Sequence, residues 1–302
     1  MPTPERRSSP LRRLWRALRW TRHSYYLLSA FLLTVFLIIY VWWPLAEEVL
    51  AYVDWSGPWW LYFDWLLVGI FLFMTLLIMA GADLRVDAWI VFVGLVGGLV
   101  IESWGTQTEI WWYYTAERPP MWIIPAWPIA SLSIDRLVRL LSKLFPQNLA
   151  HSEFRFAPPS SVKRNPHNII RWLYWLVFAA FLILMLTFVW PTVDKSLTVM
   201  ALLLVAFLIL TPTDHRLALL TFLAGAGLGY FLEYWGTTRE CWTYYTLAKP
   251  PLFAVLAHGM AAVAFWRTAL VLQLFSRKLL GIRSTASTVP ASPGPRQPKQ
   301  ES

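Results

Sequence analysis

The sequence predicts an all-α, polytopic membrane protein, a helix bundle of about eight transmembrane helices arranged as two parallel four-helix repeats. Three observations predict this fold class. Long apolar runs recur along the chain, basic residues lie beside alternate runs, and one segment recurs 131 residues later. Of the 302 residues, 57% are hydrophobic and only 14% are charged, whereas soluble domains carry about 25% charged residues.

Each apolar run is close to the roughly 20 residues that cross a bilayer as a helix. In chain order the runs are Tyr25–Trp43, Trp59–Ala80, Ala88–Trp104, Met121–Leu141, Ile169–Trp190, Leu197–Thr211, Leu217–Trp235 and Leu252–Phe275. The run at 197–211 is the shortest, and whether it spans the membrane fully stays open. No small-residue cleavage site follows the first run, so we expect a retained anchor and not a secretory signal peptide.

The distribution of charge sets the expected orientation. A net charge of +9 alone would suggest nucleic acid, but the basic residues lie beside apolar runs, where they set topology, so no nucleic-acid partner is expected. If the N-terminus is cytoplasmic, the only basic residues on the other side are Arg118, Lys195, Arg239 and Lys249. We therefore expect an integral membrane protein with both termini cytoplasmic. The sequence has no organelle-targeting features, which favours a prokaryotic plasma membrane.

The chain divides into five expected segments. These are a basic cytoplasmic N-terminal segment (1–24), a first four-helix membrane repeat (25–141), a basic cytoplasmic linker (142–168), a second four-helix membrane repeat (169–275) and a disordered cytoplasmic tail (276–302). The N-terminal segment has apolar residues on one helical face and arginines elsewhere, which is typical of a helix lying on the cytoplasmic leaflet.

The internal repeat is the most informative feature of the sequence. A shift of 131 residues aligns 83–120 with 214–251 without a gap, and 15 of the 38 positions are identical. Chance similarity between apolar segments would match Leu, Ile and Val, whereas these matches are mostly polar, aromatic, Gly and Pro. Each copy contains an even number of predicted spans, so the two copies share one orientation across the membrane.

Two glutamates are the main candidate catalytic residues. Gly94, Gly98 and Glu102 are spaced i, i+4 and i+8, so they share one helical face. The shifted copy has Gly225, Gly229 and Glu233. The glycines allow a neighbouring helix to approach closely, so each glutamate should point into the bundle, where an intramembrane carboxylate is a functional candidate. The alternative is that each glutamate caps backbone N–H groups or pairs with an arginine.

His258 is the third catalytic candidate because it lies inside the last run and breaks the symmetry of the repeat. Its shifted counterpart is Trp127. A histidine titrates near neutral pH and can carry a proton, although a buried histidine can equally be a hydrogen-bonded structural residue. Asp64, near the outer end of the second run, joins the group of ionisable residues on the non-cytoplasmic side.

An aromatic outer loop follows each glutamate. The candidate substrate-binding residues there are Trp104, Thr106, Glu109, Trp111, Tyr113 and Tyr114 in the first copy, and Trp235, Thr237, Glu240, Trp242, Tyr244 and Tyr245 in the second. Gly105 and Gly236 are expected to break the helices, and the Pro-Pro pairs at 119–120 and 250–251 to start the next ones. The rings form either an interfacial aromatic belt or a lid whose faces attract a cation.

Charged residues also mark the cytoplasmic ends of the runs. They are Asp83, Arg85, Asp214, Arg216, Arg136 and Arg267. We interpret this layer as helix-end pairing and positive-inside anchoring.

Several functional classes are not expected. The single cysteine, Cys241, excludes an intrachain disulfide framework and a multi-cysteine metal site. The sequence also lacks a phosphate-binding Gly-rich loop with Lys and a His-Glu-x-x-His motif. We therefore expect neither ATP hydrolysis nor zinc proteolysis, and no metal site or cofactor.

The segment Gly98-x-x-x-Glu102-x-x-Gly105-Thr106-x-Thr108, followed by Tyr113-Tyr114 and Pro125-Ala126-Trp127, resembles the carotenoid-biosynthesis membrane family, which includes carotenoid hydratases. The resemblance covers 98–127, with a weaker echo at 229–246. It implies that Glu102 or Glu233 protonates a C=C bond, that Trp and Tyr faces stabilise the carbocation, and that a second carboxylate orients water. No redox cofactor would be needed.

The leading hypothesis is thus a protein that binds or acts on a membrane lipid or lipid-soluble small molecule, such as an isoprenoid or carotenoid. As an enzyme it would be a cofactor-independent hydratase, lyase or isomerase. The alternatives are a non-enzymatic transporter, a membrane protein that binds a lipid headgroup or cation, and a purely structural protein. The sequence does not specify the oligomeric state.

Overall fold

The computed structural model describes residues 19–145 and 166–279. Most of the predicted N-terminal segment, cytoplasmic linker and C-terminal tail therefore lies outside the described residues. Within them the chain is helical apart from one pair of short strands, so the helical membrane fold class is confirmed.

The helices follow the predicted apolar runs. The first half contains α2 (Arg22–Val41), α3 (Trp43–Leu50), η1 (Trp59–Tyr62), α4 (Trp65–Met79), α5 (Leu84–Gln107), β1 (Trp111–Tyr113) and α6 (Ala126–Leu144). The second half contains α8 (Pro166–Val189), η2 (Trp190–Thr192), α9 (Ser196–Leu210), α10 (His215–Thr238), β2 (Trp242–Tyr244) and α11 (Leu252–Leu279).

Five of the described helices are long and apolar enough to cross a membrane, namely α2, α5, α8, α10 and α11. Helices α4 and α9 are apolar but have only 15 residues each. Helix α6 has 19 residues and carries Asp and Arg side chains on its later turns. Eight membrane crossings therefore stay a prediction.

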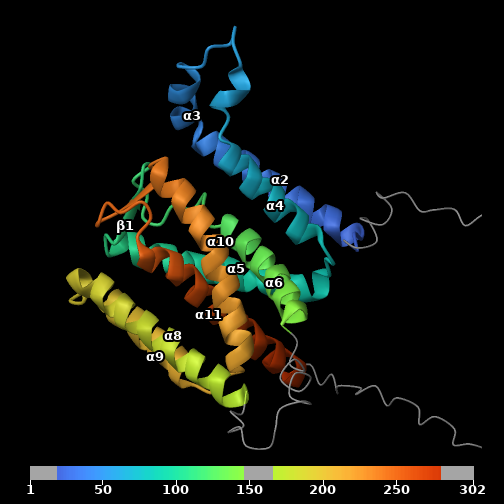
Figure 1. Cartoon of the computed structure of the whole chain (residues 1–302), viewed down its shortest axis with the longest axis vertical. Helices are drawn as coiled ribbons and strands as arrows, with labels where there is room; N and C mark the ends of the chain where they lie inside the picture. Colours follow the sequence, from blue (N-terminus) through green and yellow to red (C-terminus); the bar gives the residue numbers. More distant parts are fainter. Residues whose placement is uncertain (1–18, 146–165, 280–302) are drawn as a thin grey trace, which may run out of the picture.

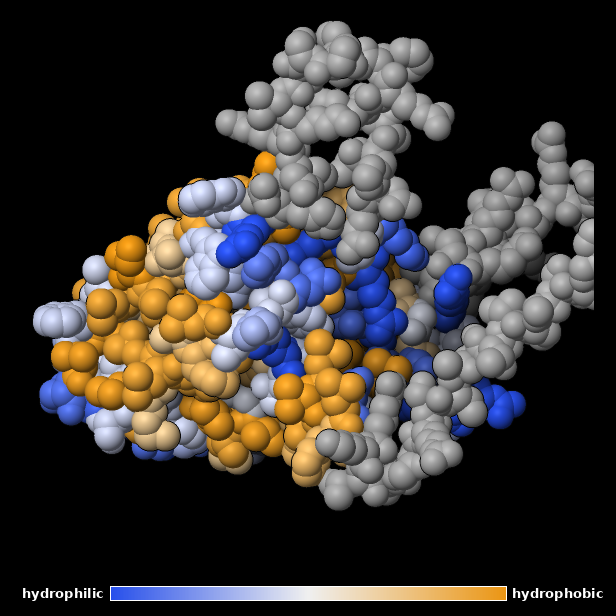
Figure 2. Space-filling model, turned by 90° about the horizontal axis from the view of Figure 1, so that it is seen from below, coloured by the Kyte–Doolittle hydropathy of each residue, from blue (hydrophilic) through white to orange (hydrophobic). Residues whose placement is uncertain are grey.

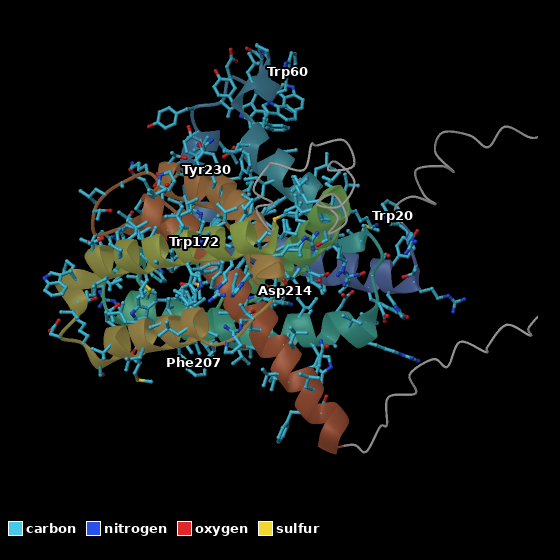
Figure 3. All side chains as sticks on the ribbon, turned by 60° about the horizontal axis from the view of Figure 1, so that its bottom comes forward. Trp20, Trp60, Trp172, Phe207, Asp214 and Tyr230 are labelled. Carbon is cyan, nitrogen blue, oxygen red and sulfur yellow. The ribbon has the colours of Figure 1, made fainter. Side chains whose placement is uncertain are left out.

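The central helices are α5, α6, α10 and α11, with the α2–α4 pair on one side and the α8–α9 pair on the other (Figure 1). Strands β1 and β2 lie at one end of this arrangement, which we call the strand end. The start of α2 and the ends of α6 and α11 lie at the opposite end (Figure 1). The loop between α2 and α4 extends beyond the central helices, and Trp60 lies at its tip (Figure 3).

Glycines set the closest helix contacts, as predicted. A Cβ atom at Gly94 of α5 would lie 2.9 Å from the Pro128 Cα of α6, and one at Gly225 of α10 would lie 2.7 Å from the carbonyl oxygen of His258 on α11. Real Cβ atoms do not approach so closely, so only glycine permits these backbones to pack. This packing directs the glutamate two turns further along each helix towards the same neighbour.

Gly105 and Gly236 do not break their helices, so that prediction is wrong. Helix α5 continues to Gln107 and α10 to Thr238. A Cβ at Gly105 would collide with the Trp111 indole, and one at Gly236 would collide with the Trp242 indole. These glycines therefore make room for an aromatic ring that folds back onto the helix.

In each half the chain reverses direction about one turn after this glycine, at a residue with a positive φ angle. Glu109 has φ 64° and Glu240 has φ 58°. The Pro-Pro prediction holds only in the second half, where α11 begins at Leu252. In the first half it is wrong, because residues 121–125 form turns and α6 begins at Ala126.

The end opposite the strands carries the predicted polar layer. Asp83 and Asp214 cap α5 and α10 by accepting hydrogen bonds from the N–H groups of Arg85 (3.1 Å) and Leu217 (2.9 Å). Arg136 pairs with buried Asp87 at 2.7 Å, a partner that the sequence analysis missed. In Figure 2 the largest group of hydrophilic residues lies beside the undescribed segments, and apolar residues cover much of the remaining face.

Candidate functional site

A short antiparallel ladder positions the aromatic side chains at the strand end. Trp111 pairs with Tyr244, and Tyr113 with Trp242. Side chains alternate along a strand, so Trp111 and Tyr113 are buried while Trp112 between them is exposed. The sequence analysis did not predict this ladder.

Glu102 lies directly beneath β1 and is 3% exposed. Its carboxylate accepts three hydrogen bonds, from Trp111 Nε1 (3.1 Å), Tyr113 OH (2.9 Å) and Trp127 Nε1 (3.1 Å). An indole N–H can only donate. The arrangement therefore suits a carboxylate that accepts and does not donate.

Glu233 lies beneath β2 and is 4% exposed. Its carboxylate contacts Trp242 Nε1, Tyr244 OH and His258 Nε2, each at 2.9 Å. The first two contacts match those of Glu102. The third differs, because a histidine stands at the position where the shifted copy has Trp127, and an imidazole nitrogen can donate or accept.

The Trp127 and His258 rings stack on each other, with centroids 5.8 Å apart and planes inclined by 18°. Each ring also contacts the glutamate of the neighbouring central helix. The stack therefore joins the two carboxylates in one continuous cluster, Glu102–Trp127–His258–Glu233, which we call the carboxylate cluster.

The two strand tyrosines are permanent hydrogen-bond donors. Burial raises the pKa of Tyr113 well above its usual range, and the negative charge of Glu102 raises it further. Burial and the charge of Glu233 raise the pKa of Tyr244 in the same way. Both phenols therefore stay protonated at physiological pH and keep donating to their carboxylates.

The carboxylate cluster faces a cavity of about 970 Å³, near the upper end of the size range of small-molecule sites. Its walls are mostly apolar side chains of α2, α4, α5, α6, α8, α9, α10 and α11. The acidic and basic side chains among its lining residues are Glu102, Glu233 and His258, without Lys or Arg in the described part of the chain. The cavity thus combines a large apolar volume with two carboxyl groups.

Six predicted binding residues also line this cavity: Trp104, Trp111, Tyr113, Trp235, Trp242 and Tyr244. Trp104 donates to Thr198 Oγ1 of α9 (3.3 Å), and Trp235 donates to Asp64 Oδ2 at the start of α4 (2.7 Å). These two indoles therefore tie central helices to helices of the opposite half.

The other predicted binding residues do not line the cavity. The hydroxyls of Thr106 and Thr237 each donate to a carbonyl one turn back, at 2.6 Å. Tyr114 OH donates to the carbonyl of Val41, and Tyr245 OH to that of Phe188. A role in substrate binding for these four stays a prediction.

Glu109 and Glu240 also lie outside the cavity lining, exposed in the loops. Glu109 pairs with Arg118 at 2.9 Å, and Glu240 with Lys249 at 2.6 Å. In each case the hydrogen bond from the basic partner lowers the pKa of the carboxyl below its ordinary value. These pairs close the two loops at the surface, and a binding role for either glutamate stays a prediction.

Two tryptophans that the sequence analysis did not include among the candidate site residues, Trp127 and Trp42, belong to the site. Trp127 could have been identified from the 131-residue repeat alone, because it occupies the position that corresponds to His258. Trp42 lines the cavity, packs on Trp235 with ring centroids 4.8 Å apart, and has a buried Nε1 without a hydrogen-bond partner among the described residues. A buried, unpaired N–H on a cavity wall is suited to a polar atom of a ligand.

The two halves are also connected by charged residues at the strand end. Asp64 of the first half pairs with Arg239 of the second at 2.9 Å. Lys195, the shifted counterpart of Asp64, donates to the Thr108 carbonyl of the first half at 3.0 Å. Within the described residues, no three His, Cys, Asp or Glu side chains are grouped so as to hold a metal ion.

The fold and the site thus define a helical membrane protein with two buried carboxylates on a large apolar cavity. Comparison with known protein-family models, with curated proteins and with solved structures finds no match.

Proposed function

We propose that this integral membrane protein binds a lipid-soluble, isoprenoid-like substrate in the cavity and performs acid/base chemistry on it. The observation that carries the proposal is the difference between two otherwise matched sites. Glu102 has three partners that only donate or stay protonated, whereas Glu233 has His258 as a partner that can exchange a proton. We further propose that eight helices cross the membrane as two parallel four-helix units, namely α2, α4, α5 and α6 in the first and α8, α9, α10 and α11 in the second.

The exchangeable proton defines the reacting group. An imidazole nitrogen can donate or accept a proton, and His258 Nε2 lies 2.9 Å from the Glu233 carboxylate, so the pair can share one proton and release it to a substrate. Transfer of that proton to one carbon of a C=C bond uses the π electrons to form a C–H bond. The other carbon becomes a carbocation, which needs neighbouring negative charge.

Glu102 supplies that charge in the proposal. Its three hydrogen-bond donors stabilise the ionised form against the cost of burying a charge, and the faces of Trp111 and Trp127 attract cations. Water that adds to the carbocation and returns a proton to Glu233 completes a hydration, and loss of a neighbouring C–H proton completes an isomerisation. Either sequence balances without an oxidant or reductant. The resemblance to carotenoid hydratases supports this reaction class.

The test compares Glu102→Gln with Glu233→Gln. Lipid and pigment extracts of cells that express each variant are compared by mass spectrometry with extracts containing wild-type protein and extracts without it. Glu233→Gln should abolish the product, because a glutamine cannot share the proton. Glu102→Gln should lower the yield without abolishing it. Glu117→Gln, in an exposed part of the loop, is the control. Identical extracts with and without wild-type protein would exclude the enzymatic function.

A second candidate function is the binding or transport of a lipophilic cation. The observation in its favour is that the cavity lining contains two carboxylates and neither Lys nor Arg. In that case tetraphenylphosphonium should bind to the purified protein, and Glu102→Gln and Glu233→Gln should weaken binding alike. If tetraphenylphosphonium does not bind, and Glu102→Gln and Glu233→Gln reduce product formation to different extents, the enzymatic function is favoured.

A further inference from the structure

Some cavity-lining residues of α5 and α9 also reach the outer surface. Val100 of α5 is 57% exposed, and Met200 and Leu204 of α9 are 64% and 53% exposed, yet all three line the cavity. A side chain that touches both the cavity and the surface marks an opening between them. Near the strand end, the Trp104–Thr198 hydrogen bond closes the gap between these two helices.

The same opening is missing from the other half. The shifted counterparts of Val100 and Leu204 are Phe231 of α10 and Phe73 of α4. Both side chains are exposed, but neither is among the residues that line the cavity. At the strand end Asp64 joins α4 to Trp235 and Arg239. By the same criterion Phe92 and Val96 of α5 and Thr268 of α11 belong to this opening, because they line the cavity and are exposed. Among the described residues the cavity therefore opens sideways along α5, beside α9 and towards α11, whereas Phe73 and Phe231 mark no such opening between α4 and α10.

The surroundings of the opening identify what can enter. Helix α5 is one of the helices suited to cross a membrane, and α9 is apolar throughout most of its length. In such helices the exposed apolar side chains face lipid hydrocarbon. The medium beside the opening is therefore the interior of the bilayer, from which a hydrocarbon chain can enter without crossing water.

The form of the cavity also suits a chain. Its lining follows α11 from Phe253 to Leu272, which corresponds to roughly 28 Å of helix at 1.5 Å per residue. The carboxylate cluster lies towards one end of that stretch, since His258 is close to its start. The β1–β2 ladder covers the strand end above the cluster.

We propose that the cavity takes a single-chain lipid from the bilayer through the opening between α5 and α9. The chain lies along α11, and one end of the molecule reaches Glu102 and Glu233. This inference rests on the proposed function and names the class of its substrate, a linear single-chain lipid.

The experiment uses full-length protein in phosphatidylcholine vesicles that contain hexadecanol with a diazirine at the end of its chain. After illumination, labelled residues are identified by mass spectrometry. The alcohol end should lie at the carboxylate cluster, so labelling is expected on the cavity residues of α11 furthest from it, Thr268 and Leu272. The entrance is then closed with a bismaleimide crosslink between Val100→Cys and Leu204→Cys, which should remove the α11 labelling.

The matched control is a crosslink between Phe231→Cys and Phe73→Cys, the shifted positions on the other side, which should leave the labelling unchanged. Labelling that survives closure of α5–α9, or that both crosslinks remove alike, would overturn the proposal. A single Val100→Trp substitution, which fills the entrance without a crosslink, gives an independent measurement and should reduce labelling in the same way.

The proposed reaction and the proposed route of lipid entry can be rejected independently of each other. Glu233→Gln should lose the product and keep the α11 labelling, because it removes a proton donor and leaves the entrance intact. Wild-type labelling without any product would reject the reaction and keep the lipid site. A product that forms equally well with the α5–α9 crosslink in place would keep the reaction and reject the entrance.

Discussion

Trp127 and His258 stack with their ring centroids 5.8 Å apart, and each contacts one of the two buried carboxylates. They occupy matching positions after a shift of 131 residues. Trp127, whose indole N–H can only donate a hydrogen bond, contacts Glu102. His258, whose ring nitrogen can donate or accept, contacts Glu233. The pair therefore gives two otherwise similar sites different chemistry.

The first prediction concerns His258→Trp. An indole at this position can donate to Glu233 as Trp127 donates to Glu102, but it cannot exchange a proton. Product formation should fall by about 10²–10⁴-fold, the usual contribution of a general acid or base, while thermal unfolding in detergent changes little. His258→Phe, which also removes the hydrogen bond, separates the two effects. Full activity of folded His258→Trp would show that His258 is not the proton carrier.

The second prediction concerns Gly105→Ala and Gly236→Ala. Each added Cβ would collide with an indole ring packed on the helix, and overpacking of this kind costs about 1–3 kcal/mol. Both variants should unfold at lower temperature in detergent. Gly227→Ala is the control, because a Cβ there meets no atom within 4 Å. Equal melting temperatures for all three variants would contradict the assigned role of these glycines.

The third prediction concerns the buried pair Asp87–Arg136. Without Asp87, Arg136 keeps only the partly exposed Asp135 as an ionic partner. Breaking a buried ion pair costs up to about 3–5 kcal/mol, so Asp87→Leu should reduce folded yield and melting temperature. The double variant Asp87→Leu, Arg136→Met should recover much of the loss, because neither charge remains. If the double variant is no more stable than the single one, the pair is not the cause of the loss.

The fourth prediction concerns the reactivity of Cys241. The thiol is 2% exposed, and burial raises its pKa to about 12. Only roughly 10⁻⁴ of such a thiol is ionised at pH 8, and the thiolate is the reactive form. Alkylation by iodoacetamide should be very slow in folded protein, rise between pH 7 and 9, and become fast after unfolding. Rapid labelling of folded protein at pH 7 would show that the loop opens.

Hydrophobicity predicted most helices, because each apolar run must satisfy its backbone groups internally in a membrane. The face shared by Gly94, Gly98 and Glu102 predicted an inward carboxylate, since spacing of four residues fixes a helical face. Glu102 and Glu233 are buried as expected.

Features that depend on distant partners escaped prediction. The β1–β2 ladder joins residues 129 to 133 positions apart, and no local signal marks such pairing. A glycine near a helix end usually indicates a C-terminal cap, but at Gly105 the packing of Trp111 overrides that local preference. Asp87 was missed because its shifted counterpart is Ala218, so the repeat gave no reason to single it out.

The strand ladder also restricts how the molecule can move. Beyond the paired strands, the Tyr114 N–H donates to the Cys241 carbonyl (3.2 Å) and the Tyr245 N–H to the Ile110 carbonyl (3.0 Å), so main chain from each half is fastened to the other. Any rocking of one half against the other must pivot about this contact between the halves and open widest at the end of the helices opposite the strands.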